Sequence, residues 1–320
     1  MATQISNQKK WRPWKGIILF FIAAAWIIGG SVLAEYIGIA GNLITQGGLL
    51  VTAIAACLIN RTPLKEVFPI KRITVRDFFG TILMWLGGLG IGLSSIYAAG
   101  LLFPDMYEAV TGGVGGIITG SSAVLAFLLV SVCPPICEEA ICRGAILSNF
   151  RGLKKDWVIV LIVGVMFGAL HMDPIRFVNT AVMGAICAYL IVKRNNFILA
   201  TIVHFCNNFL TGGLSILVSI FKPDALTATT NTAAQTMDLS TTLVSGLGST
   251  MITFAFAPVA LVIGRHLIIR QKEISEGSEK KSKLGIKLVI AIILAVAMFA
   301  GGIALTIAFN PAMAQISTQV

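Results

Sequence analysis

Charged residues are scarce along this chain. Only 12% of its 320 residues are Asp, Glu, Lys or Arg, whereas 56% are hydrophobic, and the mean hydropathy is +0.89. Soluble domains carry about twice that share of charge. The shortage of charge therefore excludes a soluble globular domain and predicts a polytopic membrane protein.

Three further features narrow the class of function. The sequence has no internal repeat, which disfavours a transporter built from inverted repeats. The Lys and Arg residues fall in short clusters between apolar runs, as in the loops of a membrane protein, so the formal charge of +10 does not indicate nucleic-acid binding. Five of the six cysteines lie well inside apolar runs and Cys57 lies near the end of one, which favours helix packing over a disulfide framework.

Long apolar runs are what the sequence does contain. A run of about 17 to 25 apolar residues is long enough to cross a bilayer as a helix. Nine such runs are present, centred near Ala24, Ala53, Gly90, Phe127, Val163, Ala185, Leu210, Phe254 and Leu294. We therefore predict an all-α, polytopic transmembrane helix bundle with eight or nine spans.

The basic residues predict the orientation of these spans. They cluster before the first run and after the second, fourth, sixth and eighth, which all fall on one side of the bilayer. Because cytoplasmic loops are rich in Lys and Arg, the N-terminus is predicted to be cytoplasmic and, with nine spans, the C-terminus outside. The first run, of about 18 residues, is interpreted as an uncleaved span rather than a signal peptide, since only then does the topology close. The expected location is the cell membrane.

We divide the chain into three consecutive parts. Residues 1–120 hold three N-terminal spans and an outer loop, residues 121–221 hold a helical core, and residues 222–320 hold a loop, two spans and a basic cytoplasmic linker. The ionisable residues found inside spans all fall in the central part. They are Glu138, Glu139, Arg143, His171 and His204.

A charge near the centre of a bilayer costs at least about 2.5 to 3.5 kcal/mol, so such a cluster is functional unless its members neutralise one another. Glu139 and Arg143 are four residues apart and share one helix face, which predicts an ion pair that anchors the helix. Glu138 points about 100° away around the same helix, so it needs another partner.

The two histidines in neighbouring spans are the candidates for that partner. Phe167 lies four residues before His171, and Asn208 lies four residues after His204, so each pair shares a helix face. At about 1.5 Å per residue from the basic clusters, Glu138 and both histidines lie roughly 15 to 22 Å into the membrane. The prolines of VCPPIC, just before Glu138, remove backbone hydrogen bonds and suit a helix that lines a water-filled cavity.

Three motifs on separate spans, EEAICRG, FGALH and HFCNN, occur in the order in which the CPBP family carries EExxxR, FxxxH and HxxxN. The sequence resembles that family of CAAX-processing and bacteriocin-processing intramembrane proteases, also called Abi or Rce1-like glutamic endopeptidases. The resemblance extends from near Ala123 to near Leu210. The spans on either side of this segment are outside it.

The resemblance implies a role for each motif residue. Glu138 would be the catalytic glutamate that activates water together with His171, while His204 and Asn208 would hold the developing oxyanion. A low-dielectric cavity suits both a carboxylate base and fixed oxyanion donors. Structural support is implied for three residues: Glu139, Arg143 and Phe167. The substrate would be a peptide or protein in the bilayer, lipidated or unmodified, and no cofactor is implied.

Other functions remain open for the same cluster. Glu138, His171 and His204 could hold a metal as a two-histidine, one-carboxylate site, although the HExxH spacing of zinc proteases is absent. The cluster could instead relay protons or ions in a transporter, or belong to a non-catalytic immunity or scaffold protein. The sequence leaves the substrate and the oligomeric state undetermined.

Overall fold

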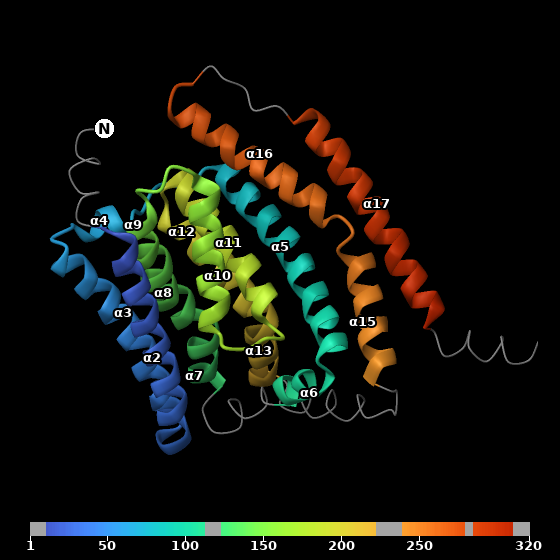
Figure 1. Ribbon diagram of the computed structural model, residues 1–320, viewed down its shortest axis with the longest axis horizontal. Coiled ribbons are helices and arrows are strands. Elements are labelled where there is room, and N and C mark those ends of the chain that lie inside the picture. The colour runs from blue at the N-terminus through green and yellow to red at the C-terminus, as the bar shows by residue number, and fades with distance from the viewer. Residues whose placement is uncertain (1–10, 113–122, 222–238, 279–283, 310–320) are drawn as a thin grey trace, which may run out of the picture. The chain divides into compact units, whose positions relative to one another are not determined.

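The computed structural model describes residues 11–112, 123–221, 239–278 and 284–309, and these ranges contain helices and no strand (Figure 1). The predicted all-α class is confirmed. The predicted boundaries after residues 120 and 221 lie in or beside stretches outside the described residues, so that division stays a prediction. Two of the basic residues before the first apolar run, Lys9 and Lys10, also lie outside the described residues, so the predicted orientation stays a prediction.

Among the described residues, six helices are long and apolar enough to cross a membrane. They are α2 (Pro13–Ile37), α3 (Ile39–Ile59), α5 (Val75–Leu102), the helix Ala123–Phe150, α11 (Phe177–Arg194) and α17 (Gly285–Ala308). The helices α15 (Leu239–Thr253) and α16 (Ala257–Ser275) form a pair bent by 44° that would make a seventh. Shorter apolar helices, Asp156–Leu170 and Phe197–Gly213, occupy the other two predicted spans. The chain is an integral membrane protein, and the number of spans stays a prediction.

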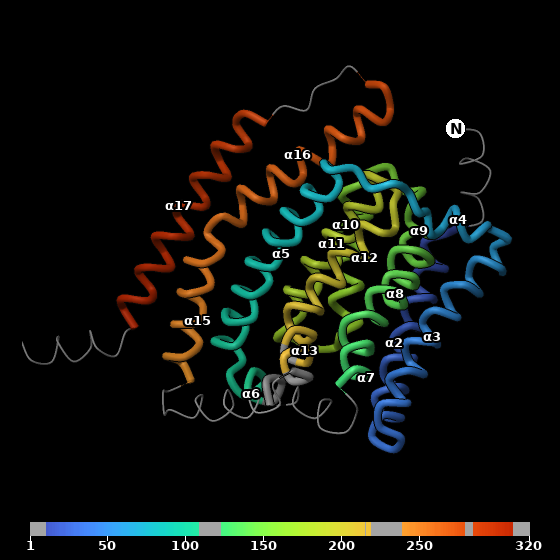
Figure 2. The backbone as a smooth tube through the Cα atoms, turned by 180° about the vertical axis from the view of Figure 1, so that it is seen from behind, coloured from blue at the N-terminus to red at the C-terminus, as the bar shows by residue number. Residues whose placement is uncertain are grey.

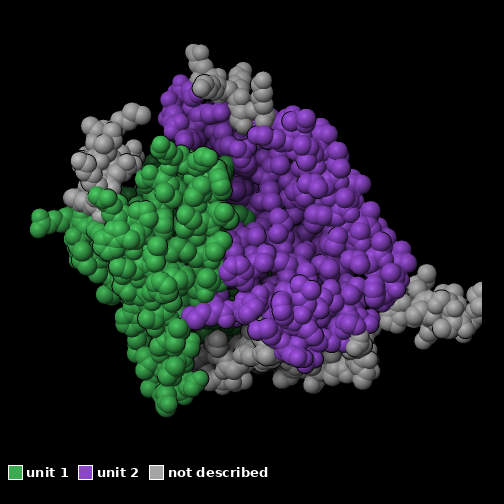
Figure 3. Space-filling model, viewed as in Figure 1, with its two compact units in different colours: residues 1–73, 115–170, 184–233 green, residues 74–114, 171–183, 234–320 purple. Residues whose placement is uncertain are grey.

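The chain folds into two compact units, each assembled from segments that are distant in the sequence (Figure 3). Unit 1 comprises residues 1–73, 115–170 and 184–233, and unit 2 comprises residues 74–114, 171–183 and 234–320. Six of the seven motif residues that the sequence singles out lie in unit 1. Only His171 lies in unit 2.

Unit 1 begins with an antiparallel pair, α2 and α3, which lie side by side in Figures 1 and 2. A single residue, Gly38, connects them, with φ of 59° and ψ of −134°. Only glycine adopts that conformation without strain. The short helix α4 (Leu64–Val67) follows α3.

The central span of unit 1 is one continuous helical stretch in which α-helical segments are interrupted by two π-helical segments. It contains α7 (Ala123–Phe127), η2 (Leu128–Val132), α8 (Cys133–Glu139), η3 (Ala140–Ile146) and α9 (Leu147–Phe150), of which η2 and η3 are π-helical. Pro134 and Pro135 lie in the first turn of α8, just after η2, and have no N–H to donate. The wider π turn lets the helix continue past the prolines, and the carbonyls of Val130 and Ser131 lose their α-helical donors.

Three helices complete unit 1 around this span: α10 (Asp156–Leu170), the greater part of α11, and α12 (Phe197–Asn208), which continues through η4 (Phe209–Gly213) into α13 (Leu214–Phe221). Asn196 caps α12, since its Oδ1 accepts from Ile198 N at 3.3 Å. Gly184 of α11 lies so close to α10 that a Cβ atom there would be 2.8 Å from the Cβ of Phe167. The absence of a side chain at residue 184 therefore sets the position of Phe167.

Unit 2 is built on α5, which packs along α16, while α15 packs against α17. A capping box starts α5: Asp77 N donates to Thr74 Oγ1, and Thr74 N donates to Asp77 Oδ2, each at 3.2 Å. A proline in the first turn of α16 follows the bend after α15, and α6 (Pro104–Gly112) follows α5.

The close approach at Gly184 predicts a stability difference between two glycine-to-alanine variants. Gly184→Ala is expected to destabilise the protein by about 1 to 3 kcal/mol, because the new methyl group overlaps Phe167. Gly29→Ala on α2 is the control, since a Cβ at Gly29 meets nothing within 4 Å. That change should be neutral or slightly stabilising. Thermal unfolding in detergent measures both, and equal melting temperatures would contradict the packing.

Candidate active site

Unit 1 brings six of the seven predicted site residues onto neighbouring helices. They are Glu138 and Glu139 on α8, Arg143 on η3, Phe167 on α10, and His204 and Asn208 on α12. Packing between the helices of unit 1 fixes the backbone position of each of these residues. The contacts among them define the chemistry that is available.

The Glu139 carboxylate is the centre of this cluster. Its Oε1 atom lies 2.8 Å from Nη1 of Arg143, and both side chains are fully buried. The ion pair expected from the i, i+4 spacing is present. Two buried charges this close offset much of each other's desolvation cost, so neither can be removed alone without leaving a bare charge.

His204 joins the same carboxylate, which the sequence did not indicate. Its Nδ1 lies 2.8 Å from the same Oε1 of Glu139, and the side chain is 8% exposed. Because a carboxylate only accepts, Nδ1 carries the proton in this contact. The second ring nitrogen, Nε2, is therefore directed away from Glu139 and toward Glu138. A buried carboxylate that fixes a histidine ring in this way also fixes its tautomer.

Phe167 covers the cluster from the side of α10. The guanidinium carbon of Arg143 lies 4.1 Å from the centre of the Phe167 ring. The edge of the same ring meets His204, with ring centres 5.6 Å apart and planes at 83°. Cation–π contact and edge-to-face packing thus restrain both partners of Glu139.

Glu138 has a different environment from its neighbour. Its side chain is 19% exposed, its Oε2 lies 3.9 Å from His204 Nε2, and its Oε1 accepts from Gln46 Nε2 at 3.1 Å. Glu138 thus faces a histidine, as the sequence suggested. It accepts a hydrogen bond from one neutral amide, and its side chain stays partly exposed.

Gln46 is a neighbour of the candidate site that the sequence analysis missed. It belongs to α3, outside all three motifs. The candidate residues were chosen from the sequence as ionisable groups inside predicted spans, and glutamine is not ionisable. An amide in an apolar span is also costly to bury, and a search that included amides would have found it.

Asn208 contacts the backbone of the central span. Its Nδ2 donates to the carbonyl of Val130 at 3.1 Å. In an α-helix this carbonyl would accept from residue 134, which is proline and cannot donate. Asn208 thus supplies the hydrogen bond that Pro134 removes, and one N–H of the amide is used in doing so.

His171 is placed differently from the other site residues. It follows Leu170, the last residue of α10, in the turn before α11, and it belongs to unit 2. Its side chain is half-buried.

Within the part of the chain that the structure describes, no group of three or more His, Cys, Asp or Glu residues could hold a metal ion.

Comparisons with known proteins bear on the central segment. Residues 119–210 match a family model described as type II CAAX prenyl endopeptidase Rce1-like. Neither the curated proteins nor the solved structures gave a significant match. The matched segment contains all three motifs, and it covers the helices from α7 to the start of η4. The resemblance read from the motifs is therefore confirmed: residues 119–210 are similar to the Rce1-like family, which is a family of peptidases.

Proposed function

We propose that this protein is an intramembrane endopeptidase in which Glu138 activates a water molecule, without a metal ion, for attack on a peptide carbonyl. The substrates would be membrane-associated peptides, either lipidated CAAX-like tails or unmodified leader-like segments, and the enzyme would act in the cell membrane. The family match supports the reaction class. The contrast between the two adjacent glutamates supports the assignment of the base.

That contrast is the observation that carries the proposal. Glu139 is fully buried and holds two basic side chains, Arg143 and His204, so its charge is already committed. Glu138 is partly exposed, accepts from a neutral amide, and lies near the outward ring nitrogen of His204. A base must reach both water and substrate, and Glu138 meets that requirement better than Glu139.

The reaction then runs in two steps. Glu138 takes a proton from water as the water oxygen bonds to the carbonyl carbon, and the carbonyl oxygen becomes an oxyanion. The carbon–nitrogen bond then breaks, and Glu138 returns its proton to the leaving amine. The base is thereby regenerated, and one water molecule is consumed for each peptide bond.

The oxyanion would be held by groups on α12. In its imidazolium form, His204 has an Nε2–H to donate, while Glu139 stabilises the ring through Nδ1, as the aspartate does in a serine-protease triad. Asn208 can offer its second amide N–H. His171 enters the proposal from the FGALH motif alone, as the partner of Glu138 in orienting water. Removing one oxyanion donor typically costs about 10²–10³-fold in kcat.

Replacement of Glu138 should abolish cleavage while the protein still folds. Glu138→Gln is expected to lower kcat by about 10²–10⁴-fold, the usual contribution of a general base. The matched control is Glu35→Gln, the same change at an exposed position of α2. New N-termini are identified by mass spectrometry after co-expression with membrane-tethered and CAAX-ended peptides. Cleavage retained in Glu138→Gln would overturn the proposal.

Gln46 would position the Glu138 carboxylate and hold its Oε1 away from His204. Gln46→Met removes that hydrogen bond at similar volume, and we expect kcat to fall about tenfold or more while KM stays unchanged. Asn42→Leu, one turn earlier on α3, is the control for loss of an amide from that helix. A parallel loss of folded protein in both variants, with normal kcat in what remains, would assign Gln46 a purely structural role.

The metal-independent mechanism predicts that chelators have no effect on cleavage. Activity of the purified protein should be unchanged after treatment with EDTA and 1,10-phenanthroline, with a known zinc protease treated in parallel as the positive control. Activity that is lost and then restored by zinc would instead favour a zinc-dependent reaction.

A further inference from the structure

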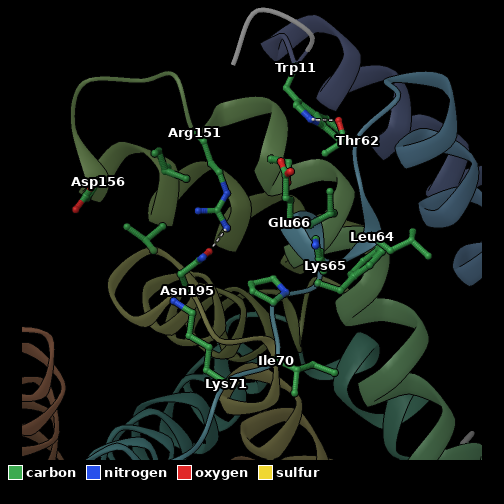
Figure 4. A pocket seen from close by; sticks show the side chains of 16 residues that line it. Trp11, Thr62, Leu64, Lys65, Glu66, Ile70, Lys71, Arg151, Asp156 and Asn195 are labelled. Carbon is green, nitrogen blue, oxygen red and sulfur yellow. Dashed lines mark hydrogen bonds between the residues drawn. The ribbon is translucent and has the colours of Figure 1, made fainter. Parts of the chain in front are cut away.

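Unit 1 contains a cavity whose lining residues take no part in the proposed reaction. Its volume is about 1000 Å³, and it lies where the α3–α5 connection, the start of α10 and the end of α11 come together (Figure 4). Arg151 on its wall follows Glu138 by thirteen residues along one helical stretch. At about 1.5 Å per residue this is roughly 20 Å, so the cavity is separate from the candidate active site.

Hydrogen bonds between distant segments hold the walls of this cavity in place. Trp11 Nε1 donates to Thr62 Oγ1 at 3.1 Å, which ties the start of α2 to the end of α3. Asn196 accepts from the backbone N–H of Lys71 at 3.2 Å and donates to its carbonyl at 3.0 Å. The cavity is therefore preformed and not a gap between loose loops.

The guanidinium of Arg151 is the group in the cavity that would bind an anion. It is half-buried, and Nη2 donates to Oδ1 of Asn195 at 3.1 Å, as the dashed line in Figure 4 shows. That partner is neutral, and no carboxylate among the described residues forms an ion pair with Arg151. Burial lowers the pKa of Arg151, but a guanidinium stays charged near neutral pH. Its charge is thus partly desolvated and not neutralised.

The other charged residues that line the cavity also leave a net positive charge. Lys65 and Lys71 add two cations, against the carboxylates of Glu66 and Asp156. Asp156 is already taken, because its Oδ2 lies 2.6 Å from Nζ of Lys193, which is outside the lining. The cavity therefore attracts an anion, and a guanidinium suits the paired oxygens of a phosphate.

Apolar side chains at the same cavity indicate that the ligand also has an apolar part. Leu64 and Ile70 line it and are 46% and 74% exposed. The cavity lies at the ends of apolar helices, on the side where the basic clusters gather, and basic pockets at that level of a membrane protein bind lipid head groups.

We propose that this cavity binds an anionic glycerophospholipid, with the phosphate at Arg151 and the acyl chains leaving past Leu64 and Ile70. Lys65 and Lys71 then favour a head group with net negative charge over a zwitterionic one. The assignment rests on unit 1 alone and is independent of the proposed peptidase activity.

Native mass spectrometry of the full chain in detergent tests the site. We expect phosphatidylglycerol to be retained over phosphatidylcholine with the same acyl chains, and inorganic phosphate not to displace it. Arg151→Gln should weaken phosphatidylglycerol binding about tenfold or more, the usual effect of losing a hydrogen bond to a charged group. Asn195→Asp should weaken it comparably, because the new carboxylate neutralises Arg151 at a position where Asp tolerates the φ of 46°.

Lys154→Gln is the control, since Lys154 is exposed in the same turn and does not line the cavity. It should bind phosphatidylglycerol as the wild type does. Equal retention of both lipids would overturn the preference for an anionic head group. A loss in Lys154→Gln as large as in Arg151→Gln would overturn the site in favour of general surface charge. Displacement of the lipid by inorganic phosphate would overturn the lipid assignment in favour of a soluble phosphate. Melting curves confirm that each variant is folded.

Discussion

The contacts of the buried Glu139 carboxylate with Arg143 and His204 are the interactions on which the rest of unit 1 depends. One oxygen contacts both Arg143 and His204, so a single charge ties the central span to α12. Phe167 adds α10 to the same junction through Arg143 and His204. Breaking a buried pair of this kind by removing one partner costs about 3 to 5 kcal/mol, because the other charge stays behind without water. The ends of three helices are thus fixed before any substrate binds.

A second constraint comes from the backbone of the central span. Pro134 cannot donate to the carbonyl of Val130, and a membrane offers no water in its apolar core to replace that donor. Asn208 replaces it from α12 at 3.1 Å. The same amide is a candidate oxyanion donor, so its orientation is set by the proline that precedes the two glutamates. Structural support and the proposed chemistry are therefore linked in one side chain.

The sequence predicted the parts of this site that follow from local spacing. The ion pair of Glu139 with Arg143 follows from residues four apart on a helix, and the helical class follows from the apolar runs. The contact of His204 with Glu139 was not predictable in this way, because it depends on how far α12 is rotated against α8. Gln46 was missed because α3 carries no motif and no charge. The sequence indicated Arg151 only as part of a basic cluster that orients the chain, because a cavity depends on packing between segments more than 30 residues apart.

The roles of the two adjacent glutamates cannot be exchanged within this backbone. Arg143 lies four residues from Glu139 and five from Glu138, so helix geometry pairs it with Glu139 and leaves Glu138 about 100° away. The donor that Glu138 then receives, Gln46, comes from outside the segment 119–210 that matches the Rce1-like family. The motifs alone therefore do not complete the environment of Glu138. Helix α3 supplies a contact to the candidate base, which gives this helix a part in the site beyond spanning the membrane.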